Sequence, residues 1–507
     1  MQWLSSLGTV GQVLRVIILV VEVLLVFNLM ILVHEWGHFL AARWRGLKVE
    51  AFYIWFGKPL WKKTINGVEY GLGCIPAGGF VKLPQMAPMD AIEGGRISDE
   101  PLPPITPLDK AIVAVAGPLF SFGLAVLFAF LVMWQGKPES EHVITTTIGY
   151  VDQDSPAQKA GLKPGDDIKS VDGHPIRRFE GFVDSVRWAV ISSEEDNILF
   201  KVARPGTPEL LEIPVSATEI KKEEEKLSWW EYIFKRPALR DIGINGRHTP
   251  MIGELQPFGP AEDAGLKPND EILSVDGIPL LSREQLAEYF KEKGPNTVEL
   301  IVRRDAKEFP VRLTPRIPDV MPPETDPELK RPMIGIIWHA KGKQTLTNPS
   351  VLTQVSDASR SMYNMITKLL AAKSGISPAH MSGPVGIGRL YYNILQDPAA
   401  LQLVLWFSVV LNINLAIMNM LPFPVLDGGH ITLAGLEAIR RRPVHSRFLE
   451  IVQTLCALTL FGFMIFVTLK DFGDMFGGGK KKQENPRFLP KDQRPAAAAP
   501  APKAPGS

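Results

Sequence analysis

The stretch that decides the fold is Val16–Phe39, VIILVVEVLLVFNLMILVHEWGHF, an apolar run that ends in a His-Glu-Trp-Gly-His motif. About 20 apolar residues cross a bilayer as a helix, so this run predicts a membrane span. On a helix, His34 and His38 share a face and can reach one ion, with Glu35 beside them to take a proton from a water. The alternative is two helical histidines with ordinary hydrogen-bond partners, which is weaker inside a span because polar groups there are costly.

Three further stretches are long and apolar enough to cross a membrane, so a four-span protein is predicted. They are Ala111–Trp134, Ala400–Leu421 and Phe448–Leu469. The net charge of +1 over 507 residues gives no electrostatic case for a nucleic-acid partner. The two cysteines, Cys74 and Cys456, are too few for a disulfide framework or a CxxC metal site.

The distribution of Lys and Arg predicts the orientation of the spans. The loop after the first span is rich in both residues, and the loop after the third span contains Arg440, Arg441, Arg442 and Arg447. Because basic loops stay in the cytoplasm, the N-terminus and the long segment between the second and third spans are expected outside. The basic residues 480–482 after the fourth span argue for the opposite side.

A repeat occupies the segment between the second and third spans. Ser155–Ile176 reads SPAQKAGLKPGDDIKSVDGHPI and Gly259–Leu280 reads GPAEDAGLKPNDEILSVDGIPL, an offset of 104 residues. Two copies of one domain explain the match. Each copy resembles PDZ domains of bacterial proteases, which implies two extracytoplasmic α+β domains that add an extended peptide to a sheet edge. Spacers or gates that bind no peptide are the alternative.

The sequence therefore predicts a multi-pass α-helical membrane protein with two PDZ-like domains and a small membrane-associated β region. The expected parts are residues 1–42 with the histidine motif, 43–108 as a loop with the β segment, 109–135 as the second span, 136–235 and 236–340 as the PDZ-like domains, 341–398 as an amphipathic helical segment, 399–446 as the third span with a basic loop, 447–470 as the fourth span, and 471–507 as a disordered tail. The amphipathic helix is expected on the outer membrane surface or on the second repeat.

Two histidines do not complete a catalytic zinc site, which needs three protein ligands and an open position. Asn412–His430 reads NINLAIMNMLPFPVLDGGH, and its prolines and glycines predict an irregular turn that lines a cavity. The first and third spans run in the same direction, so Asp427 reaches the depth of His34. His430 is a weaker candidate ligand, and a tethered protease with its third ligand in a soluble segment is the alternative.

These motifs together resemble the site-2 protease family, closest to the bacterial regulator of sigma-E type with tandem PDZ domains. The resemblance implies zinc held by His34, His38 and Asp427, with Glu35 as the catalytic base. It also implies that Asn414 and Asn419 help to bind substrate. Residues 73–82, GCIPAGGFVK, resemble the family's β loop, and Gly78 and Gly79 would then lie at a strand that pairs with the substrate.

The second span departs from the family pattern at one position. Where relatives often have Asn in Ala-Gly-Pro-x-x-Asn, this chain has Ser121. The replacement is expected to alter a contact between spans without affecting a metal ligand.

The predicted function is intramembrane zinc endopeptidase activity at the bacterial inner membrane. The resemblance implies single-span membrane protein substrates of the anti-sigma factor or remnant signal peptide type, cut after a first extracytoplasmic cleavage. Peptide ligands of the PDZ domains and the lipid bilayer are the other expected partners. A membrane scaffold with an inactive protease core is the alternative, although decay of an active site usually removes at least one of the four polar residues.

Overall fold

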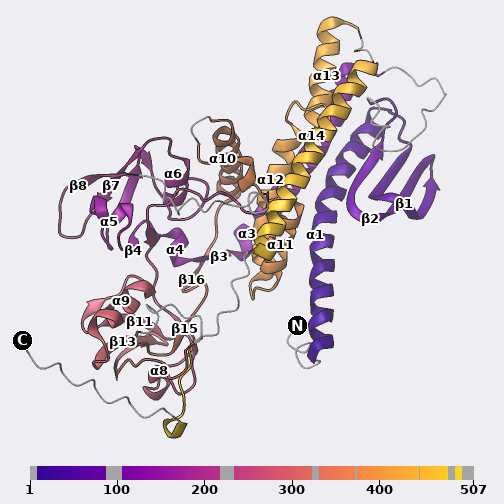
Figure 1. Cartoon of the computed structure of the whole chain (residues 1–507). Coiled ribbons are helices and arrows are strands. Elements are labelled where there is room, and N and C mark those ends of the chain that lie inside the picture. The colour runs from indigo at the N-terminus through magenta and orange to yellow at the C-terminus, as the bar shows by residue number, and fades with distance from the viewer. Residues whose placement is uncertain are drawn as a thin grey trace, which may run out of the picture.

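In the computed structural model, long helices stand beside two small α+β repeats (Figure 1). The structure describes residues 8–86, 105–216, 233–321, 331–371, 374–442, 444, 446–477 and 486–493.

Four helices among these residues are long and apolar enough to cross a membrane, as predicted. They are α1 (Gly8–Trp44), α3 (Pro107–Gln135), α12 (Ala400–Asn419) and α14 (Ser446–Phe472). α3 packs against both α1 and α12 and is the centre of the group. The 37 residues of α1 give a helix about 55 Å long, well beyond a hydrocarbon core of about 30 Å.

The predicted β region is a curled hairpin of β1 (Ala51–Ile65) and β2 (Val68–Lys82). Residues 51–54 pair with residues 79–82 on one side and with residues 69–72 on the other. The hairpin therefore folds over itself, and residues 79–82 form an outer strand. The Trp55 indole N–H donates a hydrogen bond to the Asn28 side chain in the middle of α1, which holds the hairpin alongside the first span.

The two repeats share one topology. In the first repeat, strands run in the order β6-β5-β7-β8, and in the second in the order β12-β11-β13-β14. The first repeat consists of β4 (Ile148–Val151), α5 (Pro156–Ala160), β5 (Asp167–Val171), β6 (His174–Pro175), α6 (Val186–Ser192), β7 (Asn197–Ala203), β8 (Leu210–Ser216) and β9 (Ile244–Gly246). The second consists of β10 (Ile252–Leu255), α8 (Pro260–Asp263), β11 (Glu271–Val275), β12 (Ile278–Pro279), α9 (Arg283–Lys293), β13 (Val298–Arg304), β14 (Lys307–Leu313) and β15 (Ile336–Trp338).

The boundary between the repeats differs from the predicted one at residues 235/236. β9 pairs with β4, so the first repeat extends to Gly246. The repeated motif lies near the start of each copy and does not show that the last strand returns to the first.

Shorter elements connect the repeats to the long helices. They are β3 (Lys137–Ser140), α4 (Glu141–Ile144), β16 (Gln344–Thr347), α10 (Val351–Leu370), η3 (Pro378–His380), α11 (Pro384–Leu395), α13 (Asp427–Arg440), η4 (Gly473–Gly477) and η5 (Lys491–Gln493). β3 and β16 pair with each other, so the chain leaves α3 and returns towards α10 through one small sheet.

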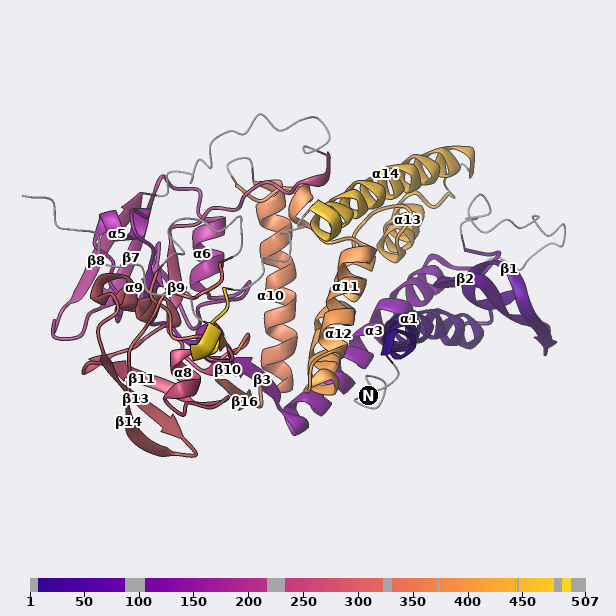
Figure 2. The ribbon, with the colours of Figure 1, turned by 60° about the horizontal axis from the view of Figure 1, so that its bottom comes forward.

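The amphipathic helix α10 does not pack on the second repeat, which was one of its two predicted places. Its apolar face packs on α3 and α12, where Ala358 joins Ala125, Ala129, Val409 and Ile413 in one core. Its other face contacts the first repeat, so α10 stands between that repeat and the spans (Figure 2). Amphipathicity shows that one face is buried, but it does not show which element buries it.

The prediction of a disordered tail over residues 471–507 is wrong for two segments. Residues 471–472 complete α14, residues 473–477 form η4, and residues 486–493 lie against the second repeat. Residues 478–485 and 494–507 lie outside the described part of the chain.

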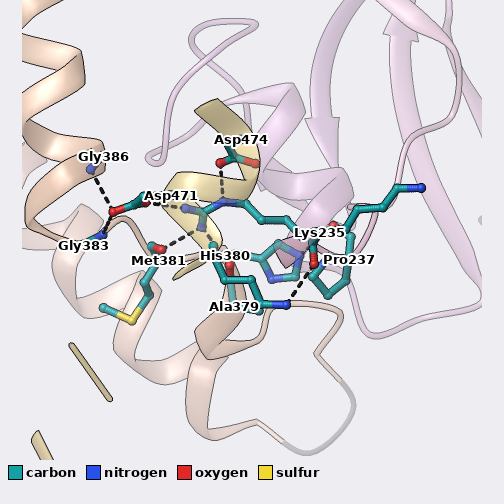
Figure 3. A network of polar contacts seen from close by, with 11 residues as sticks. Lys235, Pro237, Ala379, His380, Met381, Gly383, Gly386, Asp471 and Asp474 are labelled. Carbon is teal, nitrogen blue, oxygen red and sulfur yellow. Dashed lines mark hydrogen bonds and ion pairs between the residues drawn. The ribbon is translucent and has the colours of Figure 1, made fainter. Parts of the chain in front are cut away.

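The end of α14 is fastened to the segment between β8 and β9 of the first repeat (Figure 3). The Asp471 carboxylate accepts hydrogen bonds from Arg236 (2.7 Å) and from the backbone N–H groups of Gly383 (3.0 Å) and Gly386 (2.8 Å) at the start of α11. Arg236 also pairs with Asp474 at 2.6 Å. The fourth span therefore ends on the side where the repeats lie.

Candidate active site

Three predicted ligands from distant parts of the sequence meet at one point. His34 Nε2 and His38 Nε2 are 3.2 Å apart, and the Asp427 oxygens lie 3.3 Å from the first and 3.4 Å from the second. Within the described residues, this is the group of His, Cys, Asp and Glu side chains that is arranged to hold a metal ion. His430 is not a member, and no ligand from the repeats takes part.

Asp427 reaches the histidines because the chain turns back directly after α12. α12 ends at Asn419, and Asp427 begins α13. Glycine is required within this turn, since a Cβ on Gly428 would lie 2.3 Å from the backbone oxygen of Leu421, and one on Gly429 would lie 2.1 Å from that of Phe423. The Pro-x-Pro-x-Leu-Asp-Gly-Gly sequence thus builds a compact turn that presents a carboxylate at a helix start.

The inner face of α3 supports both histidines. His38 Nδ1 lies 2.8 Å from the backbone oxygen of Val113, and His34 Nδ1 lies 3.0 Å from the Ser121 hydroxyl. With Nδ1–H donating to these oxygens, each Nε2 lone pair is left for a metal ion. Between the two acceptors, Gly117 provides room, because a Cβ there would lie 2.1 Å from His38 Nε2.

The expectation that Ser121 affects no metal ligand is therefore wrong, because its hydroxyl contacts His34 directly. Sequence reasoning also missed Val113 and Gly117. A signal was available in the small residues Gly117 and Ser121, which lie four positions apart, the spacing at which membrane helices approach closely. Gly37 faces the same crossing, since its Cβ would lie 2.4 Å from the Ala116 oxygen.

Glu35 lies between the histidine pair and the outer strand of the β hairpin. A Cβ on Gly79 would lie 3.5 Å from Glu35 Cγ, and the Val81 backbone forms a hydrogen bond with the Glu35 carboxylate. Gly79 therefore lies beside Glu35. Gly78 has φ +76°, and a Cβ there would lie 2.0 Å from the Phe56 ring. Glycine at this position therefore allows the strand to pass close to Phe56, and it has no contact of its own with the three ligands.

The two asparagines of α12 have different positions. The Asn419 amide lies 3.2 Å from His34 Nε2 and is thus part of the centre. Asn414 is five residues earlier, which is one full turn and about 140° further around the helix axis. Asn414 therefore lies on another face of α12. The Asn414 side-chain oxygen is buried without a hydrogen-bond partner.

The donor set fits zinc. Zn–N distances of about 2.0–2.1 Å in a tetrahedral site put neighbouring donors about 3.3–3.4 Å apart, close to the three separations seen here. Asp427 Oδ2 is buried and has no hydrogen-bond partner, as expected for an oxygen that faces a cation. Two imidazoles and one carboxylate also leave the fourth position for a water.

A protein-family model described as Peptidase family M50 matches residues 22–463, nearly the whole chain. The chain belongs to this family. The M50 peptidases are the site-2 protease family, so the resemblance seen in the sequence is confirmed and the chain is a zinc metalloprotease.

Named relatives match along most of their length. Regulator of sigma E protease from Salmonella typhi is 26% identical over 89% of this chain and 97% of its own. Protease RseP from Yersinia pestis is 28% identical over 88% of this chain and 96% of its own. Among solved structures, the PDZ domain of the SdrC-like protein from Listeria monocytogenes is 22% identical and covers 18% of this chain and 86% of its own, with a TM-score of 0.15, which is too low to carry an argument.

Proposed function

We propose that this M50 peptidase cuts single-span membrane proteins within or near the bilayer of the bacterial inner membrane. The observation that carries the proposal is the meeting of His34 and His38, within the apolar helix α1, with Asp427, which follows the apolar helix α12. A complete set of ligands with Glu35 beside it favours an active protease over a scaffold with a decayed core.

In the proposed mechanism, His34, His38 and Asp427 hold the zinc ion, and Glu35 acts as the general base. Zinc, when bound, supplies a Lewis acid that acidifies a water and polarises the scissile carbonyl. Glu35 accepts the proton of that water and then delivers it to the leaving amine. Val113 and Ser121 keep both imidazoles oriented while the charge at the centre changes.

The outer strand of the hairpin is the proposed binding place for the substrate backbone. Residues 79–82 pair with residues 51–54 on one side, and Gly79 faces Glu35. A substrate helix must unwind to expose a peptide bond, and a strand edge replaces the backbone hydrogen bonds that it loses. Asn419 at the centre, and Asn414 on α12, are the proposed additional substrate contacts.

The repeats are proposed to lie outside the cytoplasm and to act as PDZ domains. The distribution of basic residues supports this orientation. The contact of Asp471, at the end of α14, with Arg236 of the first repeat agrees with four spans, which return the chain to the side on which it began. The proposed substrates are anti-sigma factors or remnant signal peptides whose outer domains have already been removed.

The test is cleavage of a single-span model substrate by purified protein in lipid nanodiscs. Glu35→Gln should lower the cleavage rate by about 10²–10⁴-fold, the usual contribution of a general base. Zinc content should stay at the wild-type level, which separates loss of the base from loss of the site. Wild-type cleavage by Glu35→Gln would refute the mechanism.

A further inference from the structure

The second repeat holds a segment that comes from beyond the fourth span. The N–H of Arg487 donates to the oxygen of Val320 at 2.9 Å, and the N–H of Val320 donates to the oxygen of Arg487 at 3.0 Å. The N–H of Leu489 also donates to Asp319 Oδ2 at 2.8 Å. The segment is thus bound by one antiparallel β-bridge and by one hydrogen bond to a side chain. This is the pairing used when an extended peptide adds a strand to a domain, here over a single residue pair.

Phe488 provides the apolar part of this contact. It is only 4% exposed, although it lies in a Lys- and Pro-rich stretch of sequence. Its ring packs on Gly335, where a Cβ would come within 3.0 Å of the ring. The Arg316 guanidinium lies 4.9 Å from the ring centroid and also donates to the Phe258 oxygen. The Phe488 ring is therefore packed between the backbone of Gly335 and the Arg316 guanidinium.

The repeats differ in what lies beside the glycine that precedes the last strand, Gly243 before β9 and Gly335 before β15. In the first repeat, a Cβ on Gly243 would lie 2.4 Å from the Ser155 Cβ, so the serine fills the space beside this glycine. In the second repeat the position that matches Ser155 is Gly259, and a Cβ on Gly335 would lie 3.0 Å from the Phe488 ring. The Phe488 ring therefore occupies the space that a side chain at position 335 would need.

The docked segment lies beside α8 in both views, away from the spans (Figures 1 and 2). The chain that leads to this segment starts from the end of α14, which is held in place because Asp471 and Asp474 pair with Arg236 (Figure 3). The contacting residues of the repeat are Arg316, Asp319, Val320 and Gly335. They lie between β14 and β15, and none belongs to the β10–β15 ladder.

We propose that residues 316–320 and Gly335 form a peptide-docking site for an extended segment with a central phenylalanine. Its ligand is residues 486–489 of the same chain, which strap the second repeat to the end of the fourth span. The site is separate from the sheet edges and independent of the protease chemistry.

The binding test uses a labelled peptide, ENPRFLPKDQ, copied from residues 484–493. The chain shortened after Gly477 should bind this peptide, while the full chain should bind at least tenfold more weakly because its own segment fills the site. A peptide with Phe488→Ala should lose at least tenfold in affinity, about the effect of exposing one large apolar side chain. Equal binding by the full and shortened chains, or by the two peptides, would overturn the proposal.

Asp319→Ala in the shortened chain is the matched variant, since it removes the carboxylate oxygen that accepts from the Leu489 N–H. Asp319 is half-buried, so the repeat should keep its melting temperature. The peptide should bind at least fivefold more weakly, because a hydrogen bond to a charged group is lost. Unchanged binding by this variant would contradict the assigned site.

Cysteines at Val320 and Arg487 test whether the strap is formed within one chain, in a background with Cys74 and Cys456 replaced by alanine. Oxidation should give a crosslinked monomer, while a control pair of Lys201→Cys and Arg487→Cys should not crosslink. A crosslinked dimer, or no crosslink, would overturn the assignment to the same chain.

Discussion

The two repeats have the same fold but are attached to the molecule in different ways. Each is stabilised by a buried aspartate that pairs with an arginine, Asp166 with Arg204 at 2.7 Å and Asp270 with Arg304 at 2.6 Å. The first repeat is joined to the spans through α10 and β3, whereas the second contacts the first repeat, the C-terminal segment and the start of β16. A duplicated domain has thus kept its core and diverged in its contacts.

The attachment of the first repeat runs through α10 and β3. Asp184 pairs with Arg360 of α10 at 2.6 Å, and Lys368 pairs with Glu194 at 2.8 Å. Arg178 pairs with Glu139 of β3 at 2.6 Å. α10 in turn packs on α3 and α12, the helices that carry Ser121 and Asn419. A displacement of the first repeat therefore reaches the active site through packed elements.

The second repeat contacts the first repeat and the connection that follows β15. Glu288 accepts a hydrogen bond from Tyr150 of the first repeat at 2.6 Å, and Glu141 accepts one from the N–H of Thr249 at 2.8 Å. Glu271 pairs with Lys343, directly before β16, at 3.0 Å. We infer that the second repeat is coupled to the catalytic centre more weakly than the first, because none of these contacts is with α10.

The largest expected effect comes from the shared buried pair. Asp166→Asn and Asp270→Asn should each destabilise their own repeat by about 3 kcal/mol, because each leaves an arginine without its buried partner. Only Asp166→Asn should lower cleavage of a substrate without an outer domain, by about tenfold, a typical coupling between distant sites. Hydrogen exchange of each repeat and cleavage rates measure the two effects. Equal loss of cleavage in both variants would contradict the comparison.

A smaller effect is expected from the α10 contact. Arg360→Ala removes a partly exposed ion pair worth at most about 1 kcal/mol and should raise hydrogen exchange in residues 181–192 up to about fivefold. Arg312→Ala is the control, since its pair with Glu299 lies within the second repeat. The same exchange pattern in both variants would mean that α10 does not hold the first repeat.

The smallest effect should come from mild acidification. Burial, followed by repulsion from His248, lowers the pKa of His142 below 6.5, while Glu180 and Glu141 oppose this shift. His142 lies at the boundary of the repeats, against the His248 ring. Because its pKa is lower in the folded protein than in the unfolded chain, its stabilising contribution is present above pH 6.5 and is lost as the pH falls below that value.

The attachment of the first repeat should resist the same acidification. Burial opposes ionisation of Glu139, but the charges of Lys137 and Arg178 outweigh it and lower its pKa from 4.5 to about 2. Its contribution is present above pH 4.5 and is lost between pH 4.5 and 2. At pH 5.5, spin-label distances should change between the repeats and not between the first repeat and α3. His142→Gln should remove the change, and a change that persists in this variant would contradict the assignment.

The sequence was sufficient to predict that His34, His38 and Asp427 meet, because the determinants of this arrangement are local or follow from chain direction. The spacing of His34 and His38 is a property of any helix, and the parity of four spans brings Asp427 to the same depth. The support from Val113 and Ser121 was not predicted, because it depends on how closely α3 crosses α1. The docked Phe488 was not predicted, because a single apolar residue in a polar stretch carries little signal.

The central claim is that Asp427 joins His34 and His38 in holding zinc. Zinc content of the purified full chain, measured by mass spectrometry, tests it most directly. Wild type and Glu35→Gln should carry about one zinc per chain, and Asp427→Ala should carry about a tenth or less, because two imidazoles alone hold the ion weakly. Wild-type zinc content and affinity in a folded Asp427→Ala protein would contradict the account.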